Sequence, residues 1–100
     1  MIDYLSGTMI DIPNVYSLAP AYPNPFNPST TLSFGLPQDT FVNIEVYDLL
    51  GKNVTTLVND IKSAGFHKYS WNAEAQASGV YFIVMNAGKF TQKQKILLVK

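Results

Sequence analysis

The sequence contains no cysteine, no arginine and a single histidine. Without cysteine, the chain has neither a disulfide framework nor a thiolate ligand for a metal ion. Arginine supplies most of the bidentate contacts that specify bases and hold phosphates, so its absence argues against a nucleic-acid partner. One histidine cannot build a histidine-based metal cluster. We therefore expect no metal site, no cofactor and no nucleic-acid partner.

Long apolar runs and a signal peptide are also missing. No stretch approaches the roughly 18 apolar residues that a membrane-spanning helix needs. Residues Met1–Tyr4 lack the basic start and the apolar middle of a secretory signal peptide. We expect a protein that does not span a membrane, and an exported form would carry its address elsewhere or on a longer chain.

The composition is that of one folded domain. Hydrophobic residues make up 47% of the 100 residues and aromatic residues 13%, which excludes a disordered chain and suffices for one core. The net charge is zero, yet all seven lysines follow residue 50, whereas five of the seven acids precede it. Strands of both halves intermix in a sandwich, so we favour a mixed surface over a single basic face.

Alternating apolar and polar residues, interrupted by turn residues, predict a series of strands. They are expected at 15–19, which is the weakest, and at 30–36, 41–48, 53–59, 66–71, 79–86 and 90–99. Residues 72–78 are expected to form at most one helical turn, capped by Asn72, because seven residues cannot hold an isolated helix. This pattern is typical of an all-β, seven-stranded immunoglobulin-like β-sandwich.

The same alternation indicates which side chains face the core. Val42, Ile44 and Val46 are expected inside, and Trp71 should anchor the core. The strand at 79–86 is apolar on both faces, which predicts a central strand with a layer packed on each side. Gly51 should allow a tight turn by taking a positive φ.

The stretch Tyr22–Pro28, here called the gateway segment, stands apart because it holds three prolines. They remove backbone donors and fix φ, so it can be neither helix interior nor central strand. We predict a stiff surface segment at the boundary between residues 1–19, a linker or the trailing edge of a preceding domain, and a sandwich of residues 20–100. Its prolines (Pro23, Pro25 and Pro28) should prevent strand pairing, while Tyr22 and Phe26 should pin it onto the sandwich.

No catalytic constellation is visible, so we expect a non-enzymatic domain. The acids are scattered, and His67 is interpreted as a structural residue. Aromatic rings can stack on sugars, but a small β core uses the same residues, and we favour the core interpretation. The aromatic residues in question are Tyr22, Phe26, Tyr47, Tyr69, Trp71 and Tyr81. The late lysines form either a basic strip or edge protection; they are Lys89, Lys93, Lys95 and Lys100.

Four stretches together resemble the C-terminal sorting domains of proteins exported by the type IX secretion system. These domains are similar in turn to the immunoglobulin-like domain of the flagellar hook-capping protein. The stretches are Tyr22–Pro28 with Thr30–Phe34, Val46–Val54, Ser78–Phe82 and Lys95–Lys100. Two features depart from the family pattern: Lys52 stands where arginine is commoner, and the loop between Trp71 and Gly79 is short.

The resemblance implies a secretion and sorting signal of a larger exported protein, located at the cell surface or outside after passage through the periplasm. Its implied partners are the outer-membrane translocon and a sortase-like peptidase. The sorting-motif residues carried over are Asp48, Gly51, Gly79, Tyr81, Lys95 and Lys100. Replacing the two lysines is expected to impair export with little loss of stability. A carbohydrate-binding or adhesive accessory module, with a polysaccharide partner, remains the alternative, and a hook-cap-like assembly part is a third hypothesis.

Overall fold

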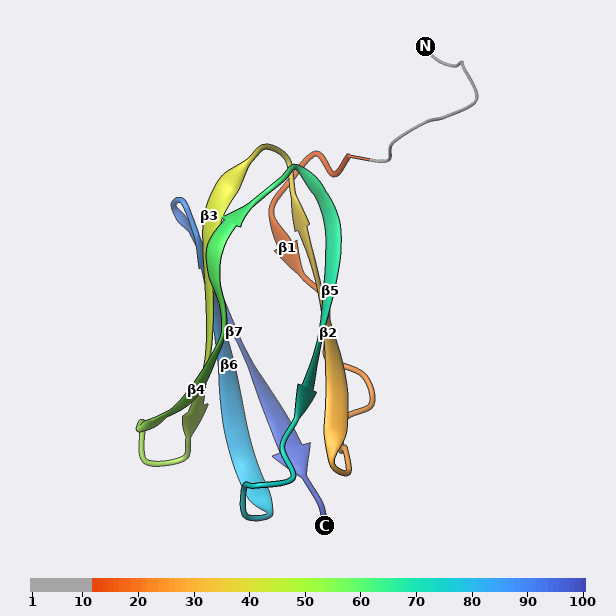
Figure 1. The fold of residues 1–100 in the computed structure, drawn as a ribbon, viewed down its shortest axis with the longest axis vertical. Coiled ribbons are helices and arrows are strands. Elements are labelled where there is room, and N and C mark those ends of the chain that lie inside the picture. The colour runs from red at the N-terminus through yellow and green to blue at the C-terminus, as the bar shows by residue number, and fades with distance from the viewer. Residues whose placement is uncertain (1–11) are drawn as a thin grey trace.

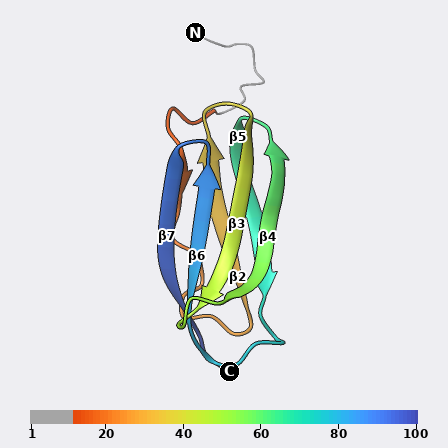
Figure 2. The ribbon, with the colours of Figure 1, turned by 90° about the vertical axis from the view of Figure 1, so that its left-hand side faces the viewer.

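The computed structural model describes residues 12–100, so the part of the expected linker at residues 1–11 lies outside the described residues. The described part forms seven strands. They are β1 (Ser17–Leu18), β2 (Ser29–Leu36), β3 (Thr40–Asp48), β4 (Asn53–Lys62), β5 (Gly65–Asn72), β6 (Gly79–Ala87) and β7 (Phe90–Leu98). Strands β1-β2-β5 form one antiparallel sheet and β4-β3-β6-β7 the other. The sheets face each other (Figures 1 and 2), which confirms the all-β, seven-stranded immunoglobulin-like sandwich.

Side-chain alternation fixes the register of the central strands. Val42, Ile44 and Val46 on β3 are fully buried, as predicted, and Ile44 and Val46 lie opposite Met85 and Ile83 of β6. The residues between them on β3 face the outside of the sheet. A slip by one residue would bring these buried side chains to the solvent, so burial of one face specifies the pairing.

The core fills the space between the two inner faces. Trp71 is 7% exposed and anchors it, as predicted. Its ring lies 5.7 Å from that of Phe26 and 5.8 Å from that of Tyr81, measured between centroids. The other large side chains that are almost completely buried are Leu32, Phe34, Leu36, Ile83, Met85, Ile96 and Leu98.

The edge strand β4 is longer than the predicted 53–59 and carries two irregularities. The register with β3 shifts between Ile44 and Glu45 and again between Val46 and Tyr47. Such bulges bend an edge strand and discourage pairing with another chain. The loop before β6 contains one hydrogen-bonded turn, from the Gln76 amide to the Ala73 carbonyl, and the Asn72 side chain accepts from the Glu74 amide.

The outer face of β6 corrects one prediction. Tyr81, Ile83, Met85 and Ala87 are buried, but of the residues between them Phe82 and Val84 are only half-buried and Asn86 is exposed. The expected second layer is absent from the described part of the chain because the two sheets cover only each other's inner faces. The apolar residues Val80, Phe82 and Val84 therefore face outward.

The gateway segment was predicted incorrectly in two respects. Phe26 is 2% exposed and is pinned into the core as expected, but Tyr22 is 80% exposed. The prolines also do not prevent pairing. Tyr22 and Thr31 exchange backbone hydrogen bonds of 3.1 and 3.0 Å, and Phe26 pairs with the end of β7. Pairing is possible because Tyr22, Asn24 and Phe26 alternate with the prolines and keep their own donors.

Candidate functional site

The turn between β3 and β4 is built by two of the proposed motif residues. Asp48 Oδ1 accepts from the amides of Leu50 and Lys52, both at 2.9 Å. Gly51 has a φ of 85°, the left-handed conformation that the sequence predicted for it. With the turn held in this way, Leu49 and Leu50 are 68% and 92% exposed at its tip. Asp48 and Gly51 therefore present two leucines to solvent.

The start of β6 holds the next two motif residues. Gly79 has a φ of 154°, which favours glycine. Tyr81 is 6% exposed, and its hydroxyl donates to the Ala77 carbonyl at 2.6 Å. Tyr81 thus ties the loop before β6 to the core while packing edge-on against Trp71.

Lys100 holds the same loop from the other side. Its Nζ donates to the carbonyls of Glu74 at 2.6 Å and Gln76 at 2.9 Å, and its amide donates to Ser78 Oγ at 3.0 Å. A lysine ammonium that bonds two carbonyls acts as a clamp on the loop. This contact was not foreseen from the sequence, since it joins residues more than twenty positions apart.

Lys95 is placed differently from Lys100. Its side chain is exposed on the outer face of the four-stranded sheet, where Lys95 pairs with Phe82 across the ladder. Lys93 shares that face, whereas Lys89 lies in the turn between β6 and β7. The late lysines therefore do not form one strip, and only Lys93 and Lys95 lie on the same face.

The sequence alone predicted little loss of stability on replacing either Lys95 or Lys100, but the different contacts of the two lysines predict different effects. We expect Lys100→Ala to lower the free energy of unfolding by about 1 kcal/mol, because two charge-assisted hydrogen bonds are lost at an exposed position. Lys95→Ala should change it by less than about 0.5 kcal/mol. Urea denaturation followed by the fluorescence of Trp71 measures both. Equal effects of the two substitutions would contradict the clamp.

The gateway segment closes the free edge of β7 at its end. Asn24 Oδ1 accepts from the Leu97 amide at 3.0 Å, and Asn24 Nδ2 donates to the Lys95 carbonyl at 3.2 Å. Phe26 donates to the Leu97 carbonyl and accepts from the Val99 amide, both at 2.9 Å. The Asn24 side chain thus acts as a strand backbone between two prolines. Sequence reasoning missed this role, although an amide side chain between two prolines can supply both a donor and an acceptor.

The aromatic residues do not gather into a platform for a sugar. Phe26, Trp71 and Tyr81 pack together in the core. Tyr22 pairs with Thr31 beside β2, and Tyr47 lies on the outer face of the other sheet. The carbohydrate-binding alternative is therefore not supported.

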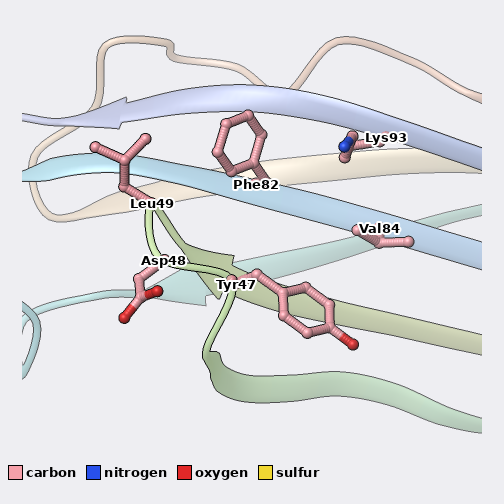
Figure 3. Close-up of a pocket in the computed structure, with 7 residues that line it drawn as sticks. Tyr47, Asp48, Leu49, Phe82, Val84 and Lys93 are labelled. Carbon is pink, nitrogen blue, oxygen red and sulfur yellow. The ribbon is translucent and has the colours of Figure 1, made fainter.

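A shallow apolar groove lies on the outer face of the four-stranded sheet, beside the β3–β4 turn (Figure 3). Its volume is about 280 Å³. It is lined by Tyr47, Asp48, Leu49, Gly51, Phe82, Val84 and Lys93. The Tyr47 hydroxyl donates to Glu45 Oε1 at 2.6 Å, and this hydrogen bond to a carboxylate raises the pKa of Tyr47. The phenol is held in its neutral, donating form.

His67 has the contacts of a structural residue. Its ring stacks on that of Phe34 with centroids 5.2 Å apart, and Nε2 lies 2.7 Å from the Ser63 carbonyl. Within residues 12–100, no three histidine or acidic side chains gather where they could hold a metal ion. In that same range, no helix is long and apolar enough to cross a membrane.

A family model matches most of the chain. The model of a family described as "Secretion system C-terminal sorting domain" matches residues 20–100 of the chain. No curated protein matches the chain. The match begins just before the gateway segment and includes every proposed motif residue.

Proposed function

Because the chain belongs to the family of secretion system C-terminal sorting domains, we propose that the type IX secretion machinery recognises it as a folded sandwich. The domain is a C-terminal sorting signal for type IX secretion, and it directs export through the periplasm to the outside or to the cell surface. As is general for sorting signals, we propose no catalytic activity for it. We further propose that the translocon contacts the folded form of the domain, at the end of the sandwich that carries the motif residues.

The observation that carries this proposal is the position of the motif residues at one end of the sandwich. The β3–β4 turn, the loop before β6 and the C-terminus lie together at this end, here called the motif end (Figure 1). Asp48 shapes the turn, and Tyr81 and Lys100 hold the loop. The contacts of Lys100 with the loop join residues more than twenty positions apart and need the folded chain, which supports recognition of the fold and not of a linear tag.

Removal of the domain by a sortase-like peptidase is a further part of the proposal. Leu18 and Ala21 are 4% exposed and Phe26 2%, and β1 pairs with β2. A peptidase needs an extended, accessible backbone. We therefore place the cleavage upstream of β1, and N-terminal sequencing of the domain released by cells tests this.

A fusion experiment tests the function itself. We expect a periplasmic reporter that carries residues 12–100 at its C-terminus to reach the cell surface in a host that has the type IX system. A matched host without the translocon should keep the same fusion in the periplasm. Surface display is measured by the accessibility of the reporter to an added protease. Periplasmic retention in the competent host would contradict the assignment.

A further inference from the structure

The outer face of β6 is apolar where an outward-facing strand is usually polar. Phe82 lies opposite Tyr47 of β3, and Val84 lies opposite Glu45. All these side chains are half-buried by their neighbours in the sheet. Exposed Leu49 extends the apolar surface toward the motif end (Figure 3). These side chains adjoin one another around the groove, and no other part of the described chain covers them, which makes the groove a candidate interaction site.

The size of the groove suits a single side chain. Its volume of about 280 Å³ lies just below the roughly 300–1,000 Å³ of pockets that hold small molecules. The Tyr47 ring forms one wall and the Phe82 ring another (Figure 3). Because the Tyr47 hydroxyl is fixed by its hydrogen bond to Glu45, this wall is held in position before any ligand arrives.

The acidic and the basic side chains around the groove differ in the hydrogen bonds that they make within the domain. Glu45 accepts from the hydroxyls of Tyr47 at 2.6 Å and Thr56 at 3.3 Å, and Asp48 Oδ1 accepts two amides of its own turn. On the opposite side, Lys93 Nζ lies 5.5 Å from the centroid of the Phe82 ring, and Lys95 is exposed beside it. The acids are engaged by internal donors, while Lys93 lines the groove and Lys95 lies next to it on the same face of β7.

We propose that this groove is a docking site for an extended segment of a partner protein that carries an aromatic side chain next to carboxylates. The aromatic ring enters between Tyr47 and Phe82, where burial of apolar area favours binding. The carboxylates lie near Lys93 and Lys95, where the opposite charge favours acidic over basic partners. That the partner is a component of the secretion machinery rests on the proposed function, whereas the docking chemistry rests only on the groove and the charges beside it.

Peptide binding tests the docking chemistry on the whole chain. The probe is acetyl-Ser-Asp-Phe-Asp-Ser-amide, and the matched probes replace both aspartates by lysine or the phenylalanine by alanine. We expect saturable amide shifts in NMR spectra at residues 47–49, 82–84 and 93 with the acidic aromatic probe. Each matched probe should bind at least tenfold more weakly. Lys93→Glu should weaken binding at least fivefold, while Lys89→Glu, in the β6–β7 turn, should not change it.

Several results would overturn the docking site. Absence of saturable shifts, shifts confined to other residues, or equal binding of the lysine probe would each contradict it. The same amides could instead shift with protein concentration alone, which would assign the groove to a second copy of this chain. Shifts that appear with phosphatidylglycerol vesicles and not with peptide would assign it to a lipid surface.

Export of the reporter fusion tests the groove in cells. Phe82→Ser and Lys93→Glu should each lower surface display at least fivefold. Lys93→Arg keeps the positive charge and should retain most of the display of the unaltered fusion. The thermal midpoints of the purified Phe82→Ser and Lys93→Glu domains show whether they remain folded. If the unaltered fusion stays in the periplasm, the proposed function fails. If that fusion is displayed and both folded variants are displayed equally well, the groove proposal fails while the proposed function stands.

Discussion

Phe26→Ala is expected to lower the free energy of unfolding by about 3–5 kcal/mol, the usual cost of deleting a buried phenylalanine. Phe26 is 2% exposed and packs on Trp71, with ring centroids 5.7 Å apart. Because small domains are stabilised by only about 5–15 kcal/mol in total, the loss is a large share of the whole. Urea denaturation followed by Trp71 fluorescence measures the change.

The control for this substitution lies in the same segment. Tyr22 is 80% exposed, so Tyr22→Ala should change the free energy of unfolding by less than about 0.5 kcal/mol. A loss of similar size in both variants would show that the aromatic residues act together and would contradict the separate roles assigned here. Phe26→Ala should also loosen the cover of β7, and concentration-dependent association on a sizing column would report an exposed strand edge.

Ile44→Asp is expected to unfold the domain and abolish surface display of the reporter fusion. Ile44 is fully buried on β3 opposite Met85, so the substitution places a carboxylate without a partner in the core. An uncompensated buried charge costs at least about 3–5 kcal/mol. If the translocon recognises the folded sandwich, the fusion should accumulate in the periplasm, where reporter activity shows that it survives.

A substitution with the same change of charge separates folding from charge. Gln38 is exposed in the turn between β2 and β3, away from the motif end, so Gln38→Asp should leave both stability and display unchanged. Circular dichroism of the purified domains measures folding. Surface display of an unfolded Ile44→Asp fusion at the level of the Gln38→Asp fusion would show that a linear signal suffices.

The sequence was most informative where one face of a strand is buried. Val42, Ile44 and Val46 alternate with outward residues, so strand and orientation could both be predicted, and Trp71 was identified as a core residue. Gly51 was identified because a tight turn needs a residue that tolerates positive φ. These features depend on neighbours in the chain, which the sequence displays directly.

The remaining features depend on pairs of residues that are far apart in the chain. Local pattern does not distinguish Phe26, which enters the core, from Tyr22, which does not. The bonds of Asn24 to β7 and of Lys100 to the loop at 73–78 follow only from how the sheets are stacked. The apolar outer face of β6 was misread as a sign of a further layer. The roles of the six motif residues in export stay predictions.

The hydrogen bonds between residues 19–24 and β7 also determine which parts of the chain must be present before the domain can complete its fold. The bonds of Asn24 join residues 71 and 73 positions apart, and those of the Gln94 side chain to Ala19 and Ala21 span 75 and 73. A growing chain makes the gateway segment long before its partners on β7. Contacts of such separation form late because the intervening chain must first be ordered. The sandwich therefore reaches its final hydrogen-bonding pattern only after β7 is present, so a chain truncated before β7 would lack the complete signal.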